Sequence, residues 1–167
     1  MNKRTFLASL TAVPVVVMGY RSATATSAPE SKMESSGPIE KLELTDAEWK
    51  ERLSEQQYAV LRNEATERAG TSPLNHEKRE GTFACAGCDL PLFKSETKYE
   101  SGTGWPSFYA AIPNHVGTKT DFKLIYPRTE YHCARCGGHQ GHIFNDGPKP
   151  TGKRYCNNGV ALKFMPA

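Results

Sequence analysis

The stretch "CARCGGHQGHIFNDGPKPTGKRYCNNGVALKF", residues 133–164, opens with a C-x-x-C pair and holds one more cysteine near its end. A second pair, "CAGC", lies far upstream at residues 85–88. Each pair presents two thiolates from one tight turn, and four sulfurs complete the tetrahedron that zinc prefers. The sequence therefore predicts one structural Zn²⁺, with no open position for metal catalysis, held by Cys85, Cys88, Cys133 and Cys136. The alternative is oxidation of each pair to a disulfide, as in redox motifs.

The fifth cysteine, Cys156, lies in "RYCNNGVALKF", residues 154–164. If this run is a strand, Arg154, Cys156 and Asn158 project from one face. A guanidinium favours the thiolate and a carboxamide offers a donor beside it, which indicates a reactive nucleophile. The alternative is an inert, buried cysteine that packs as a small hydrophobic residue.

Polar residues between the second pair and Cys156 indicate proton transfer. His139 and His142 follow the predicted zinc ligands, and Asp146 comes four residues later. Four cysteines already saturate zinc, so the histidines are candidates for general acid–base chemistry, although either could be structural. Trp105, in "SGTGWPSF" at residues 101–108, stands between glycine and proline. Its indole could form one wall of a small pocket for a thioether methyl group, or it could simply pack.

The remaining chain predicts a mostly β domain with helices confined to its N-terminal third. Thr45 with Glu48, and Ser54 with Gln57, form two capping boxes that predict two short helices. Trp49, in the first of these, is expected to pack. Strand-length apolar runs follow Gly70, namely "GTFAC" at 81–85, "FKLIY" at 122–126 and "GVALKF" at 159–164.

The N-terminus is expected to direct export. Residues 1–25 combine Lys3, Arg4 and an apolar run too short for a membrane span of about 20 residues. They predict a cleaved signal peptide with no stable membrane insertion afterwards. A retained anchor and an organelle transit peptide are the alternatives. Because "KRTFLASL" approximates a twin-arginine motif, we expect that route to the periplasm.

Residues 26–38 are small and polar and predict a flexible linker, and residues 39–167 form one domain. The whole chain carries 21 basic and 18 acidic residues, and cleavage removes three basic residues. A mature chain that is nearly neutral disfavours nucleic acid as a partner.

Several motifs together resemble the B-type methionine-R-sulfoxide reductase family. They are "LTDAEWKERL", "ATERAG", "CAGCDLPLF", "SGTGWPSF" and the opening stretch, which span roughly residues 40–165. The resemblance implies a mainly β fold of two antiparallel, barrel-like sheets with a structural Zn(Cys)4 site. It also implies protein repair under oxidative stress, with oxidised proteins or peptides that carry methionine R-sulfoxide as substrates and free methionine R-sulfoxide as the alternative.

The resemblance makes Cys156 the nucleophile that leaves the reaction as a sulfenic acid, and Trp105 the wall that receives the substrate methyl group. His142 is the first choice of proton donor, and His139 with Asp146 would orient the site or share that role. Arg154 and Asn158 match the remaining polar pocket positions.

Thr103 departs from the many relatives that carry a resolving cysteine before the tryptophan. We therefore expect a thioredoxin-like or small-thiol reductant to regenerate Cys156, with a zinc cysteine as the less favoured resolver. Two functions from other classes stay open. One is a zinc-knuckle interaction module with an inert Cys156, and the other is a disulfide oxidoreductase that uses its C-x-x-C pairs.

Overall fold

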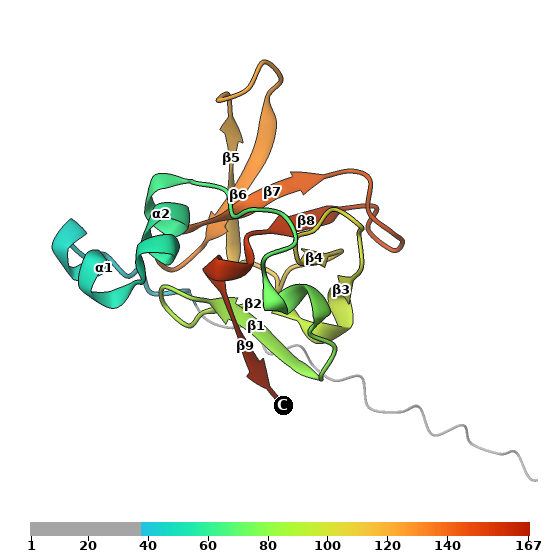
Figure 1. Cartoon of the computed structure of the whole chain (residues 1–167), viewed down its shortest axis with the longest axis horizontal. Helices are drawn as coiled ribbons and strands as arrows, with labels where there is room; N and C mark the ends of the chain where they lie inside the picture. Colours follow the sequence, from blue (N-terminus) through green and yellow to red (C-terminus); the bar gives the residue numbers. More distant parts are fainter. Residues whose placement is uncertain (1–37) are drawn as a thin grey trace, which may run out of the picture. The chain divides into compact units, whose positions relative to one another are not determined.

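Two antiparallel sheets organise the chain in the computed structural model, which describes residues 38–167. Within these residues a three-stranded sheet has the order β2-β1-β9, and a six-stranded sheet has the order β3-β4-β8-β7-β6-β5 (Figure 1). The prediction of a mainly β fold with two antiparallel sheets is confirmed. The strands are β1 (Gly81–Cys85), β2 (Pro91–Lys94), β3 (Lys98–Tyr99), β4 (Ser107–Phe108), β5 (Val116–Asp121), β6 (Arg128–Cys133), β7 (His139–Phe144), β8 (Arg154–Asn157) and β9 (Leu162–Pro166).

The signal peptide predicted for residues 1–25 lies outside the described residues, as does nearly all of the linker predicted for residues 26–38. Within the described part of the chain, neither helix has the length and apolar character needed to cross a bilayer.

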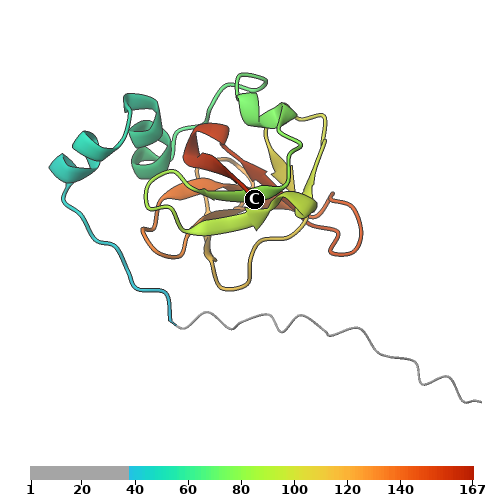
Figure 2. The same cartoon turned by 90° about the horizontal axis from the view of Figure 1, so that it is seen from below.

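Both predicted helices form where their capping boxes place them. Helix α1 (Asp46–Arg52) begins after Thr45 and helix α2 (Glu55–Asn63) after Ser54, and in each the reciprocal hydrogen bonds of the box are present. A capping side chain contributes about 1 kcal/mol to such short helices, which could not persist alone. Figures 1 and 2 both place the two helices on one side of the sheets.

An aromatic cluster joins the two sheets and forms the centre of the core. Phe93 of the three-stranded sheet stacks on Phe108 of the six-stranded sheet, with ring centroids 4.1 Å apart. Phe83 meets Phe108 edge-on at 5.0 Å, and Tyr131 meets Tyr155 at 5.3 Å. Such pairs contribute about 0.5–1.5 kcal/mol each beyond the burial of their area. The cluster fixes β4 and β8, and these strands carry the candidate site.

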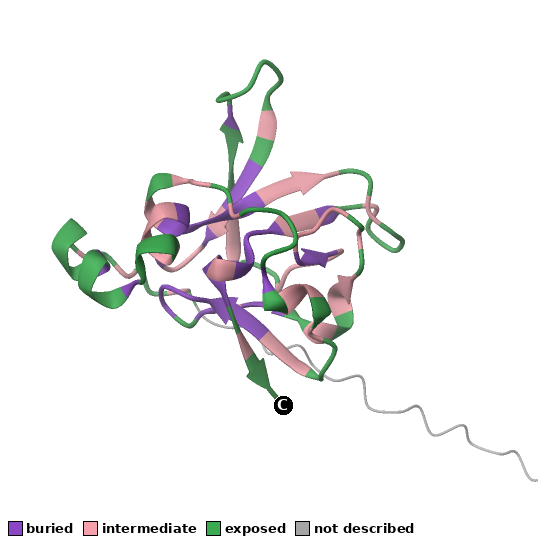
Figure 3. Cartoon of the chain, viewed as in Figure 1, coloured by how far each residue is buried: buried purple, intermediate pink, exposed green. Residues whose placement is uncertain are grey.

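The strand predicted over "FKLIY" is wrong. Residues 122–127 form the loop of the β5–β6 hairpin, which is closed by the pair Asp121 and Arg128. Ile125 is 94% exposed and Tyr126 79% exposed, and Figure 3 shows this loop as exposed. An apolar run alone predicted a buried strand, but no neighbouring element covers these side chains.

The C-terminal run is not one strand. Strand β8 ends at Asn157, a 3-10 turn covers Gly159–Ala161, and β9 begins at Leu162 in the other sheet. The turn is held because the backbone N–H of Gly159 donates to Glu67 Oε2 at 2.6 Å. A Cβ at Gly159 would clash with Ser72 Oγ, so this close approach requires glycine. The strand predicted over "GVALKF" therefore begins at Leu162, three residues after the predicted start at Gly159.

Candidate active site

The two C-x-x-C pairs meet in one buried cluster, although they lie far apart in the sequence. The first pair ends β1 and enters the following turn, and the second spans the turn between β6 and β7. The four ligand atoms all lie within 4.8 Å of one another. The four residues are Cys85, Cys88, Cys133 and Cys136.

The donor set fits one zinc ion. All the cysteines are free thiols, with Sγ–Sγ distances of 3.7 Å between Cys85 and Cys136 and 3.4 Å between Cys88 and Cys133. Zinc–sulfur bonds of about 2.3 Å in a tetrahedron place sulfurs about 3.8 Å apart, whereas a disulfide needs about 2.05 Å. The cluster therefore favours the structural metal site over the disulfide oxidoreductase.

The helices brace the metal cluster from outside. Arg62 Nη1 donates to the carbonyl of Cys136 at 2.9 Å, and Arg52 Nε donates to the carbonyl of Gly87 at 2.7 Å. The indole of Trp49 is 3% exposed, and the Arg62 guanidinium lies 4.8 Å from its ring centroid. Trp49 packs, as predicted. The cysteine turns thereby link the N-terminal helices to both sheets.

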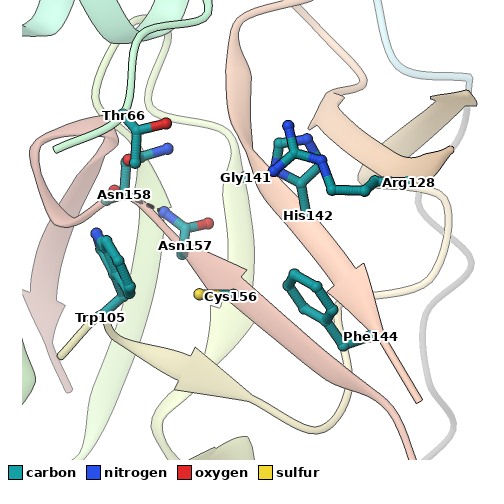
Figure 4. Close-up of a pocket in the computed structure, with 9 residues that line it drawn as sticks. All are labelled: Thr66, Trp105, Arg128, Gly141, His142, Phe144, Cys156, Asn157 and Asn158. Atoms are coloured by element: carbon teal, nitrogen blue, oxygen red, sulfur yellow. Dashed lines mark hydrogen bonds between the residues drawn. The ribbon is translucent and has the colours of Figure 1, made fainter. Parts of the chain in front are cut away.

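Cys156 lies in a separate pocket with a volume of about 140 Å³ (Figure 4). Strand register creates this placement, because Cys156 on β8 pairs with Ser107 on β4 and with His142 on β7. Directly opposed residues share a face of the sheet, with Cβ atoms about 4.5–5.5 Å apart. The pocket is lined by Thr66, Trp105, Arg128, Gly141, His142, Phe144, Cys156, Asn157 and Asn158.

Burial dominates the titration of Cys156. Desolvation raises the pKa of its thiol above the ordinary value, while Arg154 and the Thr103 hydroxyl act in the opposite direction. Arg154 therefore lies near the thiol, as strand alternation predicted. Arg154 favours the thiolate, as expected, but desolvation outweighs its effect on the pKa. The net effect on the pKa therefore favours the neutral thiol.

Asp121 and Arg128 surround His142, and the sequence did not identify either residue as part of the site. His142 Nε2 lies 2.7 Å from Asp121 Oδ2, and Arg128 Nη2 donates to the same oxygen at 2.6 Å. The pKa of Asp121 is held well below its usual range, mainly by the hydrogen bond from the backbone N–H of Lys123. The side chains of His142 and Arg128 lower it further. Because ionised Asp121 can only accept a hydrogen bond, the proton of neutral His142 lies on Nε2. Nδ1 is then free to accept a proton.

The pKa of His142 is lowered from its ordinary value. Burial is the main cause, and Arg128 adds to it, whereas the hydrogen bond with Asp121 opposes it. The imidazole is therefore neutral at rest near neutral pH and can accept a proton from a neighbouring acid.

The structure gives His139 and Asp146 separate neighbours. Asp146 binds Arg154 through two hydrogen bonds of 2.8 Å. His139 is 3% exposed and lies behind the pocket, with Nδ1 3.0 Å from Glu130 Oε1 and its ring centroid 5.5 Å from that of His142. The neighbours of His139 are set by the register between strands β6 and β7 and not by distance along the sequence.

Asn158 lines the pocket, but its side chain is already bonded. Its Nδ2 donates to the carbonyl of Gln140, and its Oδ1 accepts from the backbone N–H of Glu67, both at 2.9 Å. Trp105 Nε1 donates to the carbonyl of Glu67 at 2.9 Å, so Glu67 fixes the indole as well. Any residue type except proline could make these two contacts, because they use the backbone of Glu67. The sequence therefore could not identify Glu67 as part of the site.

Comparison with known proteins places the chain in a single family. A family model described as "SelR domain" matches residues 53–166. "Peptide methionine sulfoxide reductase B1, chloroplastic" of Arabidopsis thaliana is 52% identical over 72% of this chain and 60% of its own length. "Peptide methionine sulfoxide reductase MsrB" of Leptospira interrogans is 50% identical over 72% of this chain and 93% of its own length. The Pseudomonas putida protein of the same name is 50% identical over 77% of this chain and 97% of its own length.

The chain thus spans about 60% of the two plant relatives it matches and nearly all of the bacterial ones. A solved structure titled "Crystal Structure of Mis18 'Yippee-like' Domain" covers 53% of this chain and 98% of its own. Its TM-score is 0.42 at 18% identity.

Proposed function

The chain belongs to the SelR-domain family, and on that basis we propose that it is an oxidoreductase that reduces methionine-R-sulfoxide to methionine. The substrates are oxidised proteins or peptides, because the relatives are named as peptide reductases. The observation that carries the proposal is the register of β7 and β8. It places the Cys156 thiol opposite the His142 imidazole in a pocket that Trp105 helps to line.

The reducing step begins with the Cys156 thiol. His142 Nδ1 accepts its proton, and the thiolate sulfur attacks the sulfoxide sulfur of the substrate. The S–O bond breaks as the oxygen passes to Cys156 and gains a proton from His142. The products are methionine, which has been reduced, and Cys156 sulfenic acid, which has been oxidised.

The other polar residues position these two. Arg154, held by Asp146, faces Cys156 and opposes the rise in its pKa that burial causes. His139 lies against the His142 ring, and Asn158 holds the turn after β8 to β7. Trp105 receives the methyl group of the substrate on its indole face.

Regeneration requires an outside reductant. No other cysteine lines the pocket, because the remaining four of the chain form the buried metal cluster. Two thiols supplied by a thioredoxin-like protein or a small thiol reduce the sulfenic acid, giving one disulfide and one water. Zinc would hold the helices and turns together and takes no part in these steps.

We also propose that residues 1–25 direct export, by a twin-arginine-like route to the periplasm, and are then removed. That route would let the thiols bind zinc before they meet an oxidant. The Arabidopsis relative is named chloroplastic, so organelle import is the competing destination. Sequencing of the mature N-terminus in each cell fraction distinguishes the two.

The test of the activity is Cys156→Ser, assayed with the resolved R and S epimers of N-acetyl-methionine sulfoxide. Wild type should reduce the R epimer alone, and the variant should be inactive while retaining one zinc per chain. A variant that keeps its activity would remove Cys156 from the chemistry. An inactive wild type would instead favour the zinc-knuckle interaction module.

A further inference from the structure

The loop of the β5–β6 hairpin concentrates exposed apolar surface beside the pocket. We call residues 122–127 the hairpin tip. In the described part of the chain the exposed large hydrophobic residues are Phe122, Leu124, Ile125 and Tyr126, all in the tip, and Met165 on β9. Scattered single exposed side chains are ordinary, whereas a cluster of them indicates an interaction surface.

The tip is continuous with the candidate active site. Its flanking residues, Asp121 and Arg128, form the final pair of the hairpin. Asp121 accepts hydrogen bonds from both His142 and Arg128. Arg128 also lines the pocket. Consecutive Cα atoms are about 3.8 Å apart, so Phe122 lies one such step and Tyr126 at most two steps from these residues.

A pocket of about 140 Å³ admits one side chain and leaves the rest of a polypeptide outside. In an extended substrate the residue two positions from the sulfoxide lies about 6.6 Å along the chain, a span comparable with the two Cα steps that separate Tyr126 from Arg128 in the pocket lining. We propose that the hairpin tip binds apolar residues that flank the oxidised methionine in a substrate polypeptide. This inference rests on the proposed function and adds a preference for apolar sequence context.

The chemistry of the tip favours an oxidised polypeptide as its occupant. Methionine oxidation introduces a polar group that disrupts cores, so oxidised segments expose their apolar neighbours. An anionic membrane surface would require a cluster of about 4–8 basic residues. The tip contains only Lys123, whose Nζ lies 2.5 Å from Glu64.

A second copy of the chain fits the tip poorly. A standard protein interface uses about 20–30 residues on each side, and the tip has six residues, 122–127. It suffices for a few side chains of a peptide, where a small number of anchors supply most of the binding energy.

The experiment compares wild type with the double variant Leu124→Ser/Ile125→Ser. Both side chains are exposed, so the fold should survive, as thermal unfolding and zinc content would show. The matched control is Met165→Ser, which removes an exposed apolar side chain from the other sheet. The substrates are a peptide with one methionine R-sulfoxide between leucines, the same peptide with glycines, and N-acetyl-methionine R-sulfoxide.

The double variant should lose about tenfold in kcat/KM for the leucine peptide alone, the size of change that one lost apolar anchor produces. Met165→Ser should lose nothing. Equal kcat/KM of wild type and double variant for the leucine peptide would overturn the inference while leaving the proposed function intact. Dimerisation of wild type, or its binding to phosphatidylcholine vesicles, would also overturn it if the double variant abolishes either. Failure of wild type to reduce N-acetyl-methionine R-sulfoxide would instead refute the proposed function.

Discussion

Replacing Asp121 with asparagine tests whether the carboxylate beside His142 supports proton transfer. Asp121 Oδ2 lies 2.7 Å from His142 Nε2, and its side chain is only 5% exposed. The carboxamide of the variant would keep the shape of the side chain and remove its charge. When His142 holds the proton of Cys156 the ring is cationic, and Asp121 stabilises that cation. The loss should therefore fall on kcat more than on KM.

The magnitude follows from the type of hydrogen bond. A hydrogen bond to a charged group contributes about 1.5–3 kcal/mol, which corresponds to about 10- to 150-fold in rate when it is lost in the transition state. Water can hardly replace that hydrogen bond, because Asp121 as a whole residue is only 7% exposed. We therefore expect Asp121→Asn to reduce kcat/KM for N-acetyl-methionine R-sulfoxide within that range.

The pH dependence gives a second, independent readout. Burial lowers the pKa of His142, and the hydrogen bond with Asp121 raises it. Removing the carboxylate leaves the lowering influences unopposed. The limb of the kcat/KM profile that reports His142 should therefore move to lower pH in Asp121→Asn.

The assay is steady-state turnover with dithiothreitol, at a temperature well below the unfolding midpoint of each variant. Glu77→Gln is the matched control, because Glu77 is also a partly buried carboxylate paired with an arginine, but it lies outside the pocket. It should keep wild-type kcat/KM. An Asp121→Asn enzyme within twofold of wild type, with an unmoved profile, would refute the role given to His142.

Three other predictions concern Cys156 and the metal. Thr103→Val should raise the pKa of Cys156 further, since the hydroxyl lowers it, so the pH curve of iodoacetamide alkylation should move to higher pH; an unmoved or lower curve would contradict this. Thr103→Cys should create a resolving thiol, so that mass spectrometry after one turnover finds a disulfide between residues 103 and 156. A persistent sulfenic acid would count against the proximity of the two side chains. Removal of zinc by a chelator should lower Tm by more than about 10 °C, because only the folded chain holds the four cysteines together as a zinc site, so zinc binding contributes directly to folding, and about 1 kcal/mol shifts Tm by roughly 2–8 °C. An unchanged Tm would exclude a structural metal.

Local signals in the sequence predicted local structure well. The capping boxes at Thr45 and Ser54 predicted both helices because each depends on contacts three residues apart. The run "GTFAC" matches β1 residue for residue. The "FKLIY" run failed because hydrophobicity cannot show whether another element will cover a segment.

Sequence reasoning found Cys156, His142 and Trp105 as members of one pocket but not their partners. Asp121 and Arg128 join the site only because β5 pairs with β6 and β6 with β7, and register between strands leaves no mark in spacing. The same cause hid Glu130, which lies beside His139 on the neighbouring strand. The sequence shows the cationic neighbour that lowers the pKa of the Cys156 thiol, but it does not show the burial that raises it.

The central claim is that Cys156 takes the oxygen of the substrate. The test is a single turnover of one equivalent of ¹⁸O-labelled methionine R-sulfoxide without reductant, followed directly by mass spectrometry of the Cys156 sulfenic acid with its oxygen retained. The labelled oxygen should be found on Cys156, in a yield equal to that of methionine. Methionine formed while Cys156 stays unlabelled would contradict it.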